Sequence, residues 1–157
     1  MEKVLALLKS RGVTKQDIIE CVYFLQKQYH EQLTSDKIIY YVDSVLNKRE
    51  VQHAIYTGIA LDVAVEKKQL DNKELEEIIA KDYGLYGVDE VLAYGICNLY
   101  GSIALTNFGY IDKIKPGIIG YLNRSDHKDQ CNTFLDDIVG AVAAAAASKL
   151  AHDKEQL

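Results

Sequence analysis

Two adjacent aspartates, Asp136 and Asp137, stand directly before an apolar segment of small residues that runs to Ala147. A carboxylate that is buried without compensation is costly, so it shifts its pKa, finds a cationic partner or holds a metal ion. Two neighbouring acids cannot neutralise each other. The pair therefore indicates a site for a divalent cation or a cationic ligand.

A second acidic pair, Asp89 and Glu90, precedes another uncharged segment. If both segments are helical, Asp136 stacks above Gly140 and Asp89 above Ala93, so each pair lies over small side chains. Helices with small faces pack closely, which would bring the two pairs within reach of one metal ion. The alternative interpretation is that these acids only complement the dipoles at two helix amino termini.

Helical periodicity covers nearly the whole chain and predicts an all-α fold. We expect a single-domain bundle of about six to eight helices, in which the long uncharged segment forms a buried central helix. The expected helices are residues 2–10, 15 to about 29, 35 to 46, 51–65, 74–82, the segment from 88 onwards, a short helix after 116, and about 132 to 154.

Capping residues support several of these boundaries. Thr14 is a candidate N-cap with Asp17 in the first turn, and either Thr34 or Ser35 is a candidate N-cap for the third helix. Asp71 and Glu74 have the spacing of a capping box, with the aspartate in place of serine or threonine.

Charge and cysteine content exclude several functions. The formal net charge is −5 and no lysine or arginine cluster is present, so we expect no nucleic-acid partner. The three cysteines, Cys21, Cys97 and Cys131, are far apart and lack metal-ligand spacing. They predict reduced thiols in a cytoplasmic protein.

The segment between Glu90 and Asp112 is uncharged and about as long as a membrane-spanning helix. It nevertheless contains three glycines and polar residues such as Asn98 and Thr106. We therefore expect a helix buried in the bundle, and at most peripheral contact with a membrane.

Three ordered motifs, Val88–Val91, Phe108–Pro116 and Phe134–Ala141, resemble those of the phosphatidylglycerophosphatase A family. The resemblance covers about residues 57–150 and is nearest to the soluble, low-temperature-requirement-C-like branch of that family. It implies one domain over residues 1–157, with a helical extension at 1–56 and a family-like core at 57–150.

The resemblance implies a Mg²⁺-dependent phosphoric monoester hydrolase that converts phosphatidylglycerophosphate to phosphatidylglycerol. Its partner would be a phosphomonoester or a phospholipid headgroup. The residues on the acidic motif positions, which would bind Mg²⁺, are Asp89, Glu90, Asp112, Asp136 and Asp137. The catalytic set comprises the two acidic pairs and Lys115, the lysine before the motif proline. Lys113 and Arg124 are further candidate phosphate contacts, and His127 is the one histidine worth testing.

Two departures from the family pattern motivate an alternative. The proline-glycine-threonine-x-glycine-serine loop of the membrane-bound members has no equivalent, and Gly109 stands where the family has an arginine. The alternative is a catalytically degenerate, soluble member that acts as a metal-binding regulatory or scaffolding oligomer. A third hypothesis is a structural homo-oligomer with the acids at a subunit interface.

Overall fold

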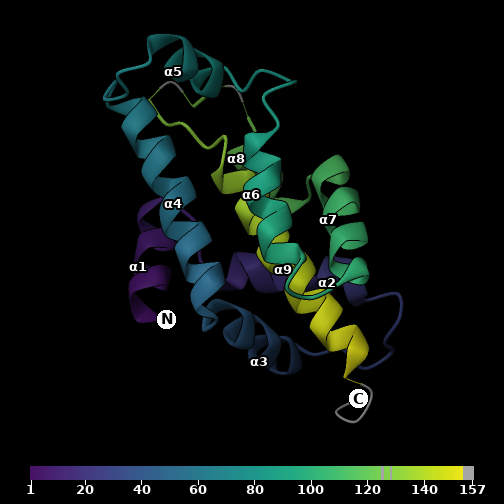
Figure 1. Ribbon diagram of the computed structural model, residues 1–157. Coiled ribbons are helices and arrows are strands. Elements are labelled where there is room, and N and C mark those ends of the chain that lie inside the picture. Colours follow the sequence, from purple (N-terminus) through teal and green to yellow (C-terminus); the bar gives the residue numbers. More distant parts are fainter. Residues whose placement is uncertain (125, 128, 154–157) are drawn as a thin grey trace.

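The computed structural model describes residues 1–124, 126–127 and 129–153, and every regular element in these ranges is an α-helix (Figure 1). The predicted all-α fold is therefore confirmed, with nine helices in the described ranges, one more than the upper expectation. They are α1 (Glu2–Ser10), α2 (Lys15–Gln26), α3 (Ser35–Leu46), α4 (Arg49–Glu66), α5 (Lys73–Ala80), α6 (Val88–Cys97), α7 (Ser102–Ile114), α8 (Gly117–Leu122) and α9 (Leu135–His152).

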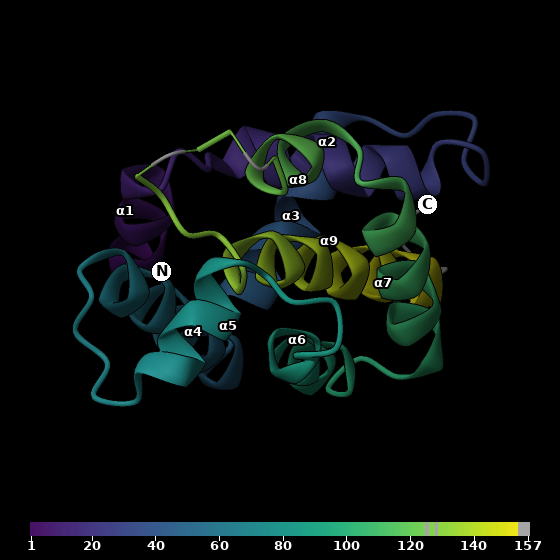
Figure 2. The same ribbon diagram turned by 90° about the horizontal axis from the view of Figure 1, so that it is seen from above.

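The central element of the bundle is α9. Seen from above, it lies between α2 and α8 on one side and α4 and α6 on the other, with α7 at its flank (Figure 2). Every residue from Leu135 to Ser148 is buried. The alanine run at 143–147 explains this position, because alanine favours the helix and its short side chain lets neighbouring helices approach closely.

The prediction that the uncharged segment forms the central helix is wrong. That segment is broken into α6 and α7 at Gly101, whose φ of +88° suits glycine and disfavours other residues. Both helices pack on α9, and each keeps an exposed face. Asn98 and Thr106 are exposed, whereas Asn107 is half-buried, so most of the polar residues that interrupt this segment face away from the core.

Side-chain capping sets the starts of α2 and α3 as expected. Thr14 and Asp17 form a complete capping box for α2, and the Thr34 hydroxyl accepts the first-turn N–H of Lys37. The predicted role of Asp71 is wrong. Asn72 is the N-cap of α5 instead, because its side-chain oxygen accepts the N–H of Leu75 at 3.0 Å.

Two further sequence expectations concern membranes and thiols. Among the residues that the structure describes, no helix combines the length and apolarity needed to cross a bilayer. The three cysteines are buried, unpaired thiols, as predicted.

Close packing of α4 on α9 depends on Gly58. An added Cβ would overlap Ile138 Cδ1 and lie 3.1 Å from Phe134 Cβ. We expect Gly58→Ala to lower the free energy of unfolding by about 1–3 kcal/mol, measured by urea denaturation. Ile138→Val in the same background should recover part of this loss, because it removes Cδ1.

The matched control for this substitution is Gly95→Ala on α6. No atom outside the local helix lies within 4 Å of a Cβ added there. Because alanine favours a helix interior over glycine, this variant should gain up to about 1 kcal/mol. Equal effects at the two glycines would contradict the packing argument.

Candidate functional site

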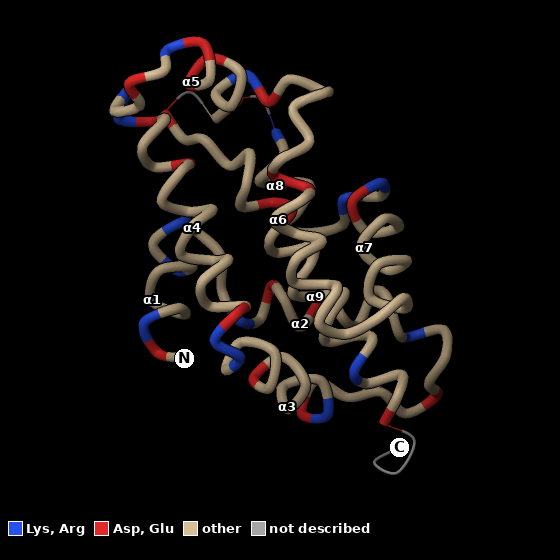
Figure 3. Tube along the Cα trace, in the orientation of Figure 1, with Lys and Arg blue, Asp and Glu red and all other residues tan. Residues whose placement is uncertain are grey.

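An acid-lined pocket of about 210 Å³ lies where the loop after α5 meets the first turns of α6 and α9 and the end of α7. Figure 3 shows acidic residues gathered at the ends of α6 and α9 that lie near α8. The pocket is lined by Asp82, Tyr83, Gly84, Gly87, Asp89, Glu90, Asp112, Lys115, Asn123, Asp136 and Asp137. All five predicted metal ligands and the predicted catalytic lysine thus line one pocket, while their functional roles stay predictions.

Two helix amino termini present the acidic pairs. Asp89 and Glu90 occupy the first turn of α6, and Asp136 and Asp137 that of α9. The positive end of each helix dipole favours these carboxylates. Dipole complementarity alone does not require burial, since Asp36 serves the same purpose at an exposed position in α3.

Burial distinguishes the pocket acids from ordinary first-turn acids. Asp89, Asp136 and Asp137 are only 7%, 4% and 5% exposed. Six carboxylates line the pocket and a single ammonium, that of Lys115, lies among them. The pocket therefore concentrates negative charge that the side chains lining it do not balance.

The end of α7 places Lys115 in the pocket. This residue terminates the helix in the left-handed conformation, with φ of +50°, directly before Pro116. Its ammonium donates to Asp112 at 2.8 Å and to Asp136 at 3.3 Å. Burial by itself would lower the pKa of Lys115, but these two carboxylates raise it above the ordinary value, so the lysine is a permanent cation.

Burial, with a further contribution from neighbouring acids, raises the pKa of both α9 aspartates. Burial raises the pKa of Asp136 to about 7, although Lys115 opposes the shift. Burial, together with the charges of Asp136, Asp89 and Asp112, raises the pKa of Asp137 to about 10. The metal-free pocket therefore holds at least one proton at neutral pH, which a bound cation would displace.

The donor chemistry of the pocket fits Mg²⁺. In the described part of the chain, no three His, Cys, Asp or Glu side chains already surround one point as metal ligands would. The Lys115 ammonium instead lies between two of the acids. The donors are nevertheless carboxylate oxygens, which Mg²⁺ prefers, so the pocket has the right ligand type without a preformed coordination shell.

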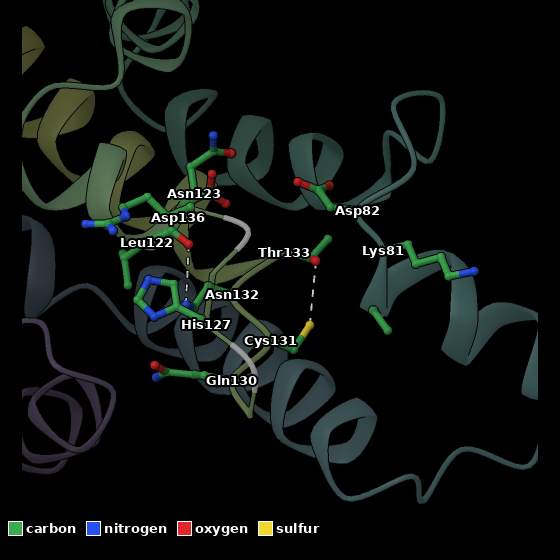
Figure 4. Close-up of a pocket in the computed structure, with 12 residues that line it drawn as sticks. Lys81, Asp82, Leu122, Asn123, His127, Gln130, Cys131, Asn132, Thr133 and Asp136 are labelled. Carbon is green, nitrogen blue, oxygen red and sulfur yellow. Dashed lines mark hydrogen bonds between the residues drawn. The ribbon is translucent and has the colours of Figure 1, made fainter.

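A second pocket, of about 300 Å³, adjoins the first and shares Asp82, Asn123 and Asp136 with it. Figure 4 shows this pocket, with His127 and Cys131 among its lining residues. Arg124 also lines it, where it pairs with Asp126, and His127 hydrogen-bonds the Tyr121 carbonyl at 2.8 Å. The structure thus places these two candidates beside the acidic pocket rather than in it, and Lys113 lies exposed on α7 outside both linings.

Sequence reasoning missed two pocket residues. Asp82 follows α5 with φ of +47° and lines both pockets, and Asn123 follows α8. Burial, followed by the charge of Asp89, raises the pKa of Asp82. The sequence gives only a weak indication of Asp82, because an aspartate just after a helix is usually a solvated turn residue.

The fold and the pocket define an all-helical protein with a carboxylate-rich site faced by one lysine. The family model described as phosphatidylglycerophosphatase A matches residues 7–152. The chain therefore belongs to the phosphatidylglycerophosphatase A family. The match also includes α2, α3 and residues 49–56 of α4, which lie outside the family-like core that the motif resemblance implies.

Similar proteins support this assignment. The chain is 57% identical over 150 residues to the uncharacterised protein YutG of Bacillus subtilis, covering 96% of this chain and 89% of YutG. It is 48% identical over 151 residues to YpjQ of the same organism, covering 96% and 84%.

Solved structures agree in fold and in the branch of the family. The low temperature requirement C protein of Listeria monocytogenes superposes with a TM-score of 0.93 at 56% identity, covering 97% of this chain and 94% of that one. A Bacillus stearothermophilus protein of unknown function gives a TM-score of 0.93 at 56% identity, covering 98% and 94%. The predicted resemblance to the low-temperature-requirement-C-like branch is confirmed.

Proposed function

We propose that this chain is a Mg²⁺-dependent phosphomonoester hydrolase that converts phosphatidylglycerophosphate to phosphatidylglycerol. The observation that carries the proposal is the meeting of six carboxylates and one lysine, drawn from separate segments between residues 82 and 137, in one pocket. Family membership supports the reaction type. A carboxylate-bound divalent cation is a frequent component of phosphoryl-transfer sites.

The residues that would hold Mg²⁺ are Asp89, Glu90, Asp112, Asp136 and Asp137. A bound Mg²⁺ supplies charge neutralisation and orientation of the phosphate oxygens. Among the side chains themselves, Lys115 provides a cation in the pocket that can bind a phosphate oxygen.

The α9 pair holds protons only in the metal-free protein. With a pKa of about 7, Asp136 is then partly protonated near neutral pH, and its neighbour Lys115 favours release of that proton. Burial and the neighbouring acids keep Asp137 protonated in the metal-free protein. A bound cation would replace this proton.

A rim of apolar side chains beside the pocket favours a lipid headgroup over a small soluble ester. Leu85, in the loop between Gly84 and Gly87 of the lining, is fully exposed, and Tyr83 and Val88 are about half exposed. Exposed apolar residues next to a binding site commonly mark a surface for a partner or a membrane. We propose that this rim contacts acyl chains or the bilayer surface peripherally.

The experiment measures phosphate release from phosphatidylglycerophosphate in mixed micelles and from glycerol 3-phosphate, with Mg²⁺ and with EDTA. We expect Mg²⁺-dependent release that is faster from the lipid. Activity that persists fully in EDTA would contradict the metal requirement. Equal rates on both substrates would contradict the lipid preference.

The alternative, a metal-binding regulatory or scaffolding oligomer, has a separate outcome. It is favoured by Gly109, which leaves the family's arginine position without a cation. Mg²⁺ binding and Mg²⁺-dependent oligomerisation without phosphate release from either substrate would replace the enzyme proposal with this one.

A further inference from the structure

A buried acid outside the pocket holds the first turn of α9. Asp62 of α4 is completely buried. Its two carboxylate oxygens accept the backbone N–H groups of Phe134 and Leu135, each at 3.0 Å. These hydrogen bonds lie in a site closed to water, where they are stronger than at a surface.

The helix lacks an N-cap from its own chain neighbourhood. Phe134 is the residue at the N-cap position of α9 and its side chain makes no capping hydrogen bond. The first N–H groups of any helix need acceptors, and a neighbouring side chain usually supplies one. Here the acceptor comes from α4, 72 residues earlier than Phe134.

The segment before α9 makes a second set of hydrogen bonds to α4, one helical turn further along that helix. Glu66, one turn after Asp62, accepts the N–H of Cys131 at 2.7 Å. Arg11 donates to the Cys131 carbonyl at 2.8 Å and to Glu66 Oε2 at 3.0 Å. The Cys131 thiol also lies 3.6 Å from the Asp62 carboxylate. Two turns of α4 therefore fix the approach to α9.

The geometry points to Asp62 as a positioning residue for the acidic pocket: it sets the location of the first turn of α9, and through it the Mg²⁺ affinity of Asp136 and Asp137. This inference rests on the proposed function and extends it. Asp62 does not line the pocket, so it would contact neither cation nor substrate. It resembles the outer partners of metal ligands, whose loss typically weakens metal affinity about 10- to 100-fold.

The first measurement is the Mg²⁺ affinity of Asp62→Asn and Asp62→Ala by isothermal titration calorimetry. Asparagine keeps one acceptor oxygen and alanine keeps none, so the affinity should fall in the order wild type, Asn, Ala, with a total loss of about 10-fold or more. Thermal unfolding in EDTA records the stability of each variant separately.

Thr14→Ala is the matched control. It removes the N-cap of α2, a helix that contacts α9 but contributes nothing to the pocket lining. We expect a lower melting temperature with unchanged Mg²⁺ affinity. Folded Asp62 variants that bind Mg²⁺ like wild type, or a Thr14 variant that loses affinity equally, would overturn the inference.

Hydrogen exchange separates this inference from the proposed function. In Asp62→Asn, amides 134–137 should exchange at least about 10-fold faster than in wild type, while amides 15–18 keep their rates. Unchanged exchange at 134–137 would overturn the positioning role whether or not the protein hydrolyses phosphate. Faster exchange and weaker Mg²⁺ binding in a protein that releases no phosphate would support it and remove only the enzyme claim.

Discussion

An Asp137→Asn variant is expected to lose Mg²⁺-dependent phosphate release by at least about 100-fold, while its metal-free form becomes more stable than wild type near pH 8. The two effects have one cause. Asp137 belongs to a carboxylate cluster that can bind a cation. Without a cation, the buried carboxylates repel one another and destabilise the fold. Asparagine keeps the shape of the side chain but neither binds the cation strongly nor ionises.

The sign of the stability effect follows from proton binding. Burial and the neighbouring acids raise the pKa of Asp137 from 3.8 to about 10 in the folded protein. Between these two values the folded state holds a proton that the unfolded chain releases, so the free energy of unfolding falls as the pH rises. The asparagine variant lacks this contribution, and its stability should depend less on pH over the same range.

The measurement is the melting temperature as a function of pH, in EDTA and in excess Mg²⁺. Wild type should gain more from Mg²⁺ at high pH than at low pH, because the cation competes with protons. The variant should gain little at any pH. Asp71→Asn, an exposed position outside the pocket lining, makes the same charge change and should behave as wild type in both buffers. A wild-type protein whose metal-free stability rises from about pH 5 to about pH 8 would contradict the argument.

Local signals in the sequence predict most of the fold, because caps and periodicity act over a few residues. Thr14, Thr34 and the alanine run of α9 are examples. The break between α6 and α7 is different. Gly95 and Gly109 lie inside helices, whereas Gly101 lies between them in a positive-φ conformation. Packing on α9 selects which glycine ends a helix, and the segment alone does not reveal it.

In the acidic pocket, too, some residues could be predicted from local sequence and others could not. The pairs at 89–90 and 136–137 could be predicted, because acids before apolar, small-residue segments are unusual. Asp62 continues the buried stripe of Ile55 and Ile59 on α4, and a lone carboxylate in such a stripe requires a partner. That partner is a pair of backbone N–H groups more than 70 residues later, which no local pattern specifies.

Lys115→Met is expected to change metal and phosphate binding in opposite directions. The ammonium occupies the space between Asp112 and Asp136, with contacts of 2.8 and 3.3 Å, and so competes with any cation for these oxygens. Without it, Mg²⁺ should bind at least as tightly as to wild type, up to about 10-fold tighter. Phosphate and the substrate lose their cationic contact, so kcat/KM should fall by about 10- to 100-fold.

Calorimetric titration with Mg²⁺ alone, followed by inhibition of phosphate release by inorganic phosphate, separates the two effects. Lys113→Met removes the same charge from an exposed position two residues away that does not line the pocket, and it should change neither quantity. Weaker Mg²⁺ binding in Lys115→Met would mean that the lysine organises the carboxylates rather than competing with the cation. Equal losses in both lysine variants would mean that long-range charge, rather than contact in the pocket, governs phosphate binding, since both changes remove one positive charge from the end of α7.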